Sequence, residues 1–285
     1  MDIDQAARAA PPRHAVIGSG SSLPTPLRIG LSRVVPELKM FYRRPEQLVL
    51  TFSMPAVIGI LLGSIFSTKL PHSDTSTGAV IAASILAYGI LSTSFINLGI
   101  SIAADRDTGA LRRLRGTPTT ASSYFIGKIF LVAVASLAEA IVLLTVGVLV
   151  FKLHLPTNAF GWFTLIWVFL LGIISCSLLG IFVSNLASNA VSAAVVTNGP
   201  AVALQFVSGT YVPLMALPTW MLTLGSVFPV KWMAQGFRSV LLPADMAAFE
   251  PAGSWEHWST FFVLTAWSIG GLIACLAVFR WSDKK

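Results

Sequence analysis

The stretch ADRDTGALRRLRGTPTTASSYFIGK, residues 104–128, interrupts a chain that otherwise avoids charge. Six of the eleven residues from 105 to 115 are charged, and long apolar runs lie on both sides of them. Of the 285 residues, only 11% are charged and 55% are hydrophobic, with a mean hydropathy of +0.77. A soluble domain has about 25% charged residues. The composition therefore indicates an integral membrane protein, and we expect the charged stretch to lie outside the hydrocarbon.

Apolar stretches long enough to cross a bilayer as a helix, about 20 residues, divide the rest of the chain. Six spans are predicted, at about 46–67, 79–103, 122–151, 160–187, 190–212 and 257–280. The fourth and fifth are separated only by the uncharged turn SNLASNA, residues 184–190. The sequence thus predicts an all-α integral membrane fold with both termini on the same side.

The distribution of Lys and Arg predicts the orientation. Six spans place Lys69, Lys152, Lys231 and Arg238 on one side and the remaining 15 of the 19 basic residues on the other. Because cytoplasmic loops carry an excess of Lys and Arg, both termini and the stretch 104–128 are predicted to be cytoplasmic. The same bias explains the net charge of +7, which could otherwise suggest a nucleic-acid partner. We expect no nucleic-acid partner.

The segment before the first span has two parts. Residues 1–25 are predicted to be a disordered cytoplasmic tail, since they lack the apolar core of a secretory signal. Residues 26–44 are predicted to form an amphipathic elbow helix, with Arg43 and Arg44 off its apolar stripe. Pro36 should kink or divide that helix. It could lie on lipid headgroups or pack on protein. The stripe contains Leu27, Leu31, Val34, Val35, Leu38, Phe41 and Tyr42.

The sequence DRDTGALRRLRG is typical of a short helix. Asp107 or Thr108 can cap its start, and Pro118 prevents its continuation. Its acids precede its arginines, as the helix dipole prefers. Leu111 and Leu114 share one face. From these residues alone, two interpretations remain open: the face docks into a groove on a soluble partner, or the charges only set the topology.

The pattern Asp105-Arg106-x₂-Gly109-x-Leu111-x₂-Leu114-x₂-Thr117-Pro118, followed by Gly127-Lys128, resembles the loop between the first two transmembrane hairpins of ABC-2 type permeases. Family members usually have E-R-E-x-G-T-L there; this chain has Asp105 and Asp107, and Ala110 in place of Thr. Residues 41–63 and 206–242 are similar to the family's elbow with its first span and to its signature after the fifth span. The resemblance covers about residues 27–281. Among subfamilies, the chain looks most like the daunorubicin-resistance, multidrug-type permeases.

This resemblance implies a permease of an ATP-driven exporter that moves drugs, polyketides or lipids out of a bacterial cell through the plasma membrane. It implies a second permease, identical or a sibling, and two ATPase subunits that bind ATP and Mg. No G-x-x-x-x-G-K-[ST] occurs in this chain, so we expect no bound cofactor. The implied coupling surface to the ATPase comprises Asp105, Arg106, Asp107, Gly109, Leu111, Leu114, Thr117 and Pro118, with the elbow residues Leu31, Leu38, Arg43 and Arg44.

The segment 213–256 is too apolar for a water-exposed loop and is broken by Pro213, Pro218, Pro229 and Pro243. Its pieces are too short to span a bilayer, and non-helical backbone at membrane depth needs cover. We therefore predict an extracellular helical hairpin over 213–243 that dips back from the outer face. The family resemblance implies a lid over the exit; a hairpin without a gating role is the alternative.

Several polar residues fall inside predicted spans. Glu139 lies near the centre of the third span and could bind a cationic substrate, carry a proton or pair with a neighbouring helix. Asn97, Asn198, Gln205 and Tyr211 are further pathway or gate candidates, with helix packing as the alternative.

Other classes of function have weaker support. The four histidines lack metal-ligand spacing, both cysteines lie within spans, and no G-x-S-x-G is present. We therefore predict no catalytic residue and no metal site. An intramembrane enzyme built on Glu139, a polysaccharide or glycolipid exporter and a non-transporting membrane assembly protein remain as alternatives.

Overall fold

The computed structural model describes residues 45–70, 73–115 and 121–278. These residues fold as helices and contain no strand, only an isolated bridge between Lys69 and Ser76. Several sequence predictions lie outside the described residues: the disordered tail, the elbow helix with Leu31, Leu38, Arg43 and Arg44, and the coupling candidates Thr117 and Pro118.

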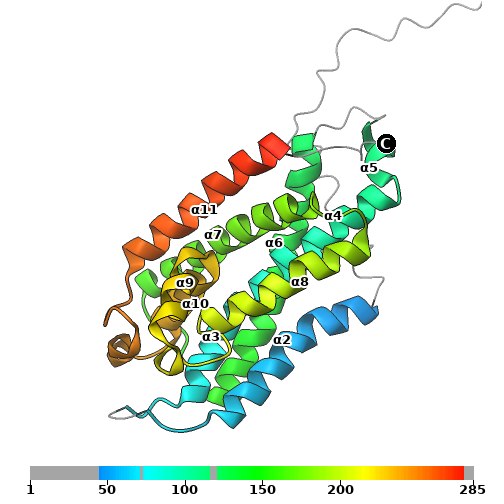
Figure 1. Cartoon of the computed structure of the whole chain (residues 1–285). Coiled ribbons are helices and arrows are strands. Elements are labelled where there is room, and N and C mark those ends of the chain that lie inside the picture. Colours follow the sequence, from blue (N-terminus) through cyan, green and yellow to red (C-terminus); the bar gives the residue numbers. More distant parts are fainter. Residues whose placement is uncertain (1–44, 71–72, 116–120, 279–285) are drawn as a thin grey trace, which may run out of the picture.

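Long helices run side by side along the bundle (Figure 1). One of them is composite, because its middle turn is a π-helix that joins two α-helical parts without a break: α3 (Thr77–Leu91), η1 (Ser92–Asn97) and α4 (Leu98–Asp107). The other long helices are α2 (Pro45–Ile65), α6 (Ala121–Phe151), α7 (Ala159–Ser184), α8 (Ala190–Val207) and α11 (His257–Val278).

Five helices of the described chain are long and apolar enough to cross a membrane. They are Thr77–Asp107, Ser123–Phe151, Ala159–Ser184, Ala190–Val207 and His257–Ala277. α2 has 21 residues and contains the apolar stretch Thr51–Ile65, but it is not one of these five helices. The all-helical, multi-pass membrane fold is thus confirmed, whereas the first of the six expected spans stays a prediction.

Short helices mark the two ends of the bundle (Figure 1). At one end, α5 (Ala110–Arg115) follows α4; we name this the α5 end. At the opposite end, the proline-rich segment forms short helices as its prolines predict; we name this the α10 end. These helices are η2 (Leu214–Ala216), α9 (Thr219–Val227), α10 (Pro229–Leu241) and η3 (Ala244–Phe249).

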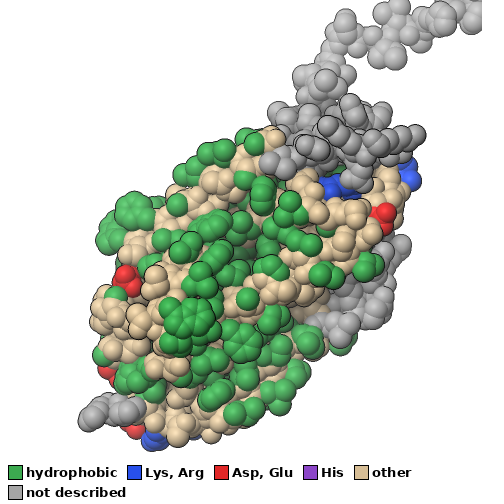
Figure 2. Space-filling view, in the orientation of Figure 1, with side chains coloured by type: hydrophobic (Ala, Val, Ile, Leu, Met, Phe, Trp, Pro, Cys, Tyr) green, Lys and Arg blue, Asp and Glu red, His purple; other side chains and the backbone are tan. Residues whose placement is uncertain are grey.

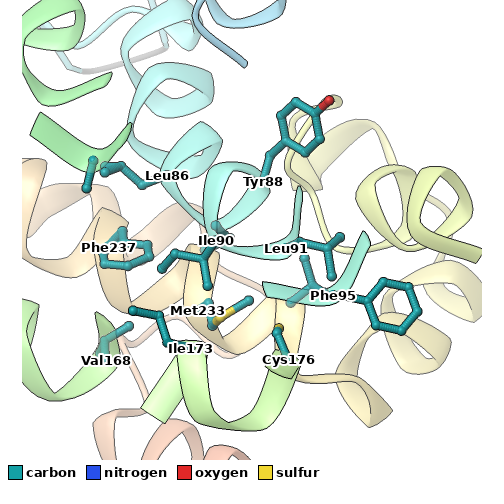
Figure 3. Close-up of a cluster of buried hydrophobic side chains, with 14 of the residues drawn as sticks. Leu86, Tyr88, Ile90, Leu91, Phe95, Val168, Ile173, Cys176, Met233 and Phe237 are labelled. Atoms are coloured by element: carbon teal, nitrogen blue, oxygen red, sulfur yellow. The ribbon is translucent and has the colours of Figure 1, made fainter. Parts of the chain in front are cut away.

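α10 lies in the core and not on the outside of the bundle. Eleven of its residues are buried, and it packs against α3, α7 and α11. Figure 3 shows Met233 and Phe237 of α10 among Ile90 of α3 and Val168 and Ile173 of α7. The hairpin is therefore held by the same apolar cluster that joins the long helices.

Glycines allow two close backbone contacts between long helices. A Cβ atom added at Gly78 of α3 would lie 2.3 Å from the carbonyl oxygen of Gly63 in α2. One added at Gly180 of α7 would lie 2.8 Å from the carbonyl oxygen of Phe95 in η1. Small residues permit such approaches in membrane helices, so the π-helical turn is fixed against α7 at backbone distance.

The outer surface of the bundle is apolar. Figure 2 shows hydrophobic side chains over most of one face. On α8 the exposed apolar residues Val191, Val195, Val202 and Phe206 follow one stripe of the helix. Such a surface suits lipid or another membrane helix, in agreement with the composition.

Candidate functional site

The charged segment begins inside a helix and not in a loop. α4 continues to Asp107, and Thr108 closes it by donating from its backbone N and its Oγ1 to the carbonyl oxygen of Ala104. Gly109 then adopts a positive φ of +70°, which favours glycine after a helix end. The expectation that Asp107 or Thr108 caps the start of the short helix is therefore wrong: Asp107 is the last residue of α4, and Thr108 caps its end.

Asp105 joins α4 to α6. Its Oδ2 accepts a hydrogen bond of 2.8 Å from the Tyr124 hydroxyl and lies 3.0 Å from Nζ of Lys128. Lys128 also donates to Oγ of Ser101 at 3.1 Å. The pair is largely buried, with the Lys128 side chain 8% and the Asp105 side chain 30% exposed. Asp105 is thus committed to contacts within the chain.

Arg106 joins α4 to the turn between α7 and α8. Its guanidinium donates to the carbonyl oxygens of Ser184 at 2.9 Å and Ala187 at 3.3 Å, and to Oδ1 of Asn185 at 3.0 Å. These acceptors lie at the C-terminal end of α7, where a positive charge is favoured by the helix dipole. Arg106 is buried, so it ties helices of the bundle together.

The coupling candidates divide into internal and surface groups. Leu111 is 0% exposed and belongs to the core cluster, so it cannot be part of an exposed two-leucine docking face in this conformation. The reason is that α5 packs back onto α4 after the turn at Gly109. Asp107 and Arg113 are exposed. The side chain of Leu114 is outside the described part.

Glu139 lies deep in the bundle with little compensation for a charge. Its side chain is 1% exposed, and Oγ1 of Thr93 in the π-helical turn donates to its Oε2 at 2.5 Å. Its Oε1 has no hydrogen-bond partner among the described residues. Gly89 of α3 makes the space, since a Cβ there would lie 3.1 Å from Cδ of Glu139. π-helical turns occur frequently at functional sites.

The other pathway candidates do not gather at one point. Asn97 is half-buried and lines a cavity of about 70 Å³ between α4 and α6. Asn198 is exposed and donates to the carbonyl oxygen of Ala194 in its own helix. Gln205 is buried, and its Oε1 has no partner among the described residues. Tyr211 packs edge-on against Tyr88, with ring centroids 5.6 Å apart.

An apolar pocket opens near Tyr211. It has a volume of about 400 Å³, within the range of small-molecule sites. Residues of α2, of the segment after it and of the end of α8 line this pocket: Ile58, Leu61, Leu62, Phe66, Phe206, Tyr211 and Val212.

Sequence reasoning missed a charged cluster at the α10 end. Nε and Nη2 of Arg238 donate to the two carboxylate oxygens of Glu250 at 2.6 and 3.0 Å, and Nη1 donates to Oγ of Ser84 in α3 at 2.9 Å. Arg238 is 1% exposed. The sequence did contain a signal for this cluster. A basic residue in an apolar segment is expected to have a charged or polar partner nearby.

Lys231 extends this cluster along α10. Its Nζ lies 3.7 Å from Oε2 of Glu256 and 3.5 Å from the centroid of the Trp232 ring. Burial lowers the pKa of Lys231 below its usual range, although the carboxylates of Glu256 and Glu250 act in the opposite direction. Both basic residues of α10 thus face acids of the segment that follows it.

The described residues contain no cluster of three or more His, Cys, Asp or Glu side chains that could hold a metal ion. Residues 34–242 match the family described as ABC-2 type transporter. No curated protein sequence matches the chain at a significant level. The family match extends over most of the chain, through α10, and includes the α4–α5 junction and Glu139. The chain therefore belongs to the ABC-2 type transporter family, the membrane permease components of ABC transporters.

Proposed function

We propose that this chain is the permease subunit of an ATP-driven ABC exporter that moves amphipathic substrates such as drugs, polyketides or lipids out of the cell. Two copies of a separate ATPase bind ATP and Mg²⁺ and supply the energy. A second permease, identical or a sibling, completes the pathway. The complex lies in the bacterial plasma membrane with both termini in the cytoplasm, as the positive-inside bias indicates.

The observation that carries this proposal is the anchoring of the α4–α5 junction. Asp105 connects it to α6, and Arg106 connects it to the α7–α8 turn. A force applied to α5 therefore acts on several long helices at once. ATP binding that favours one ATPase arrangement could then shift the population of the permease between two states.

The apolar pocket near Tyr211 supports an amphipathic substrate over a polysaccharide. The side chains that line it among the described residues are aliphatic or aromatic. A polysaccharide needs polar partners for its hydroxyl groups, because unpaired buried polar groups are costly. The pocket lies towards the α10 end, where the proposed lid would cover the exit.

Co-purification with a candidate ATPase in lipid nanodiscs tests the proposal. The variant Arg113→Glu reverses an exposed charge on α5, and Lys69→Glu reverses an exposed charge near the opposite end. We expect the wild type and Lys69→Glu to retain the ATPase and change its turnover. Arg113→Glu should weaken both retention and coupling while the unfolding temperature stays the same.

Two results would contradict the proposal in different ways. If Arg113→Glu and Lys69→Glu behave alike, α5 is not the coupling surface. If the wild type retains no ATPase encoded beside it, a non-transporting assembly protein becomes the better interpretation. For the substrate, Phe206→Ala should reduce stimulation of the ATPase by amphipathic compounds, whereas Phe262→Ala on the exposed face of α11 should not.

A further inference from the structure

We propose that Glu139 is a proton-binding site in the middle of the bundle, supplied with protons from the α5 end. The route is a line of polar side chains that we name the polar seam. It consists of Thr93, Asn97, Ser101 and Asp105 on η1–α4, with Lys128 and Glu139 on α6. The cytoplasmic origin of these protons rests on the proposed function, which places the α5 end in the cytoplasm. The proton-binding site itself does not depend on the proposed function.

The seam is continuous because its residues repeat every four positions. Thr93, Asn97, Ser101 and Asp105 are each separated by four residues, which places them on one face of the composite helix. That face meets α6: Asp105 and Ser101 contact Lys128, and Thr93 contacts Glu139. The seam therefore runs from the partly exposed Asp105 to the deeply buried Glu139.

The middle of the seam is a cavity of about 70 Å³. Its polar lining comes from Thr93, Asn97, Ser101 and Lys128. A cavity needs only about 10–15 Å³ of this kind of volume per water molecule and two to four polar partners. This space is therefore large and polar enough for water between Lys128 and Thr93, but far too small for a drug or a lipid.

A carboxylate at the position of Glu139 lacks a counter-charge among the residues that the structure describes. Lys128 is eleven residues away on the same helix, about 16 Å along the axis, and is already paired with Asp105. Burial of an unpaired charge costs far more than burial of the neutral acid. The hydrogen bond from Thr93 does not offset that cost. An acid at this position is therefore more stable with a bound proton than as a carboxylate.

The helices packed against α6 supply no cation to Glu139 within the described part. α7 has no charged residue, and its one ionisable side chain is Cys176; α2 has only Glu46 in its first turn. α3 contributes Tyr88, whose phenol cannot carry a positive charge. The charged residues of α4 lie at the α5 end. No described side chain on these helices therefore supplies a positive charge that could neutralise Glu139 in place of a proton.

The transfer is balanced without a further reactant. A hydronium ion in the cavity gives a proton to Oγ1 of Thr93, and Thr93 passes its own hydroxyl proton to Oε2 of Glu139. The hydronium becomes water, Thr93 is unchanged, and the charge of Glu139 changes from −1 to 0. Release follows the reverse path. Since Thr93 lies in the π-helical turn of the helix that carries Asp105 and Arg106, the charge state of Glu139 acts directly on the helix leading to α5.

Infrared spectroscopy of the purified chain in nanodiscs tests the site without an ATPase. We expect the carbonyl-stretch band of a protonated carboxylic acid in the wild type and its loss in Glu139→Gln. The band should fade as the pH is raised and shift in D₂O. Thr93→Val removes the donor to the carboxylate and should keep the band to higher pH, whereas the neighbouring Ser94→Ala should leave the titration unchanged. Identical spectra for the wild type and Glu139→Gln at every pH would overturn the proposal.

A second pair of variants tests the route. Asn97→Leu fills the cavity at the α5 side and should slow hydrogen–deuterium exchange of the band several-fold. Tyr88→Phe removes the ionisable group of α3, which does not line the cavity, and should leave the exchange rate unchanged. The opposite pattern would overturn the route from the α5 end, and loss of the band on addition of Na⁺, K⁺ or Mg²⁺ would identify a metal-cation site instead. If the chain fails to retain an ATPase but the band behaves as expected, the proposed function fails and the proton site stands.

Discussion

Two buried ionisable residues of this chain, Arg238 and Glu139, are equally buried but have different partners. Each side chain is 1% exposed. Arg238 makes a two-pronged ion pair with Glu250 and a third hydrogen bond to Ser84. Glu139 has one hydroxyl donor and an oxygen atom without a partner among the described residues.

The Arg238–Glu250 ion pair, which we name the latch, differs in this way from Glu139, which can change its charge. A buried ion pair with satisfied hydrogen bonds is stable in one state and expensive to break. A buried acid without a cation can become neutral at little cost. We therefore expect Arg238 and Glu250 to stay ionised and paired, whereas Glu139 can gain or lose a proton.

The largest expected effect follows from breaking the latch. Glu250→Gln leaves Arg238 charged, buried and without its counter-charge, and should cost about 3–5 kcal/mol of stability. Thermal unfolding in nanodiscs measures this cost. Asp74→Asn removes the acid of the exposed Lys69–Asp74 pair and is the matched control, with no measurable change expected. Equal unfolding temperatures for the two variants would show that the Arg238 pair is not a latch.

An intermediate effect is expected at Arg106, whose partners are neutral oxygen atoms and not an acid. Arg106→Met keeps much of the side-chain length but removes its hydrogen bonds to the α7–α8 turn. Hydrogen bonds to a charged group contribute about 1.5–3 kcal/mol, so we expect a loss of that order together with weaker coupling to the ATPase. Arg113→Met, at an exposed position, should leave the unfolding temperature unchanged; a loss as large in this control would argue against the anchoring role.

A small effect is expected when the same chemical change is made at the other acid. Glu139→Gln should cost less than about 1 kcal/mol, the contribution of one neutral hydrogen bond, because the neutral acid already resembles the amide. The difference between Glu139→Gln and Glu250→Gln in thermal unfolding measures the comparison directly. A loss at Glu139 as large as that at Glu250 would mean that Glu139 is ionised and paired.

The smallest effect is expected at Lys231. Its pairing is weaker than that of Arg238 but stronger than that of Glu139, since its Nζ lies 3.7 Å from Oε2 of Glu256. Burial lowers its folded-state pKa below the unfolded value of about 10.4. Between these two pKa values the unfolded chain binds more protons than the folded chain, so stability should rise with pH across that window. The slope of unfolding temperature against pH should be smaller in Lys231→Met. An identical slope in the variant would exclude Lys231 as its source.

The sequence alone predicted the helical membrane fold because hydrocarbon forces every backbone polar group to be satisfied within a helix. Apolar run length located the five observed spans, and the prolines predicted the short helices of the α10 end. Glu139 was recognisable because a carboxylate near the centre of a long apolar run cannot reach water. These features depend on local composition and spacing.

The tertiary structure decided which of the charges meet and which side chains stay accessible. Asp105 pairs with Lys128, Arg106 binds the end of α7, and Arg238 reaches Ser84 across 154 positions of the sequence. Leu111 turned inward because Gly109 reverses the chain after α4. Such pairings depend on the rotation of each helix about its axis and on close contacts such as Gly180 with η1. Hydropathy carries no information on helix rotation, because in lipid both faces of a helix are apolar.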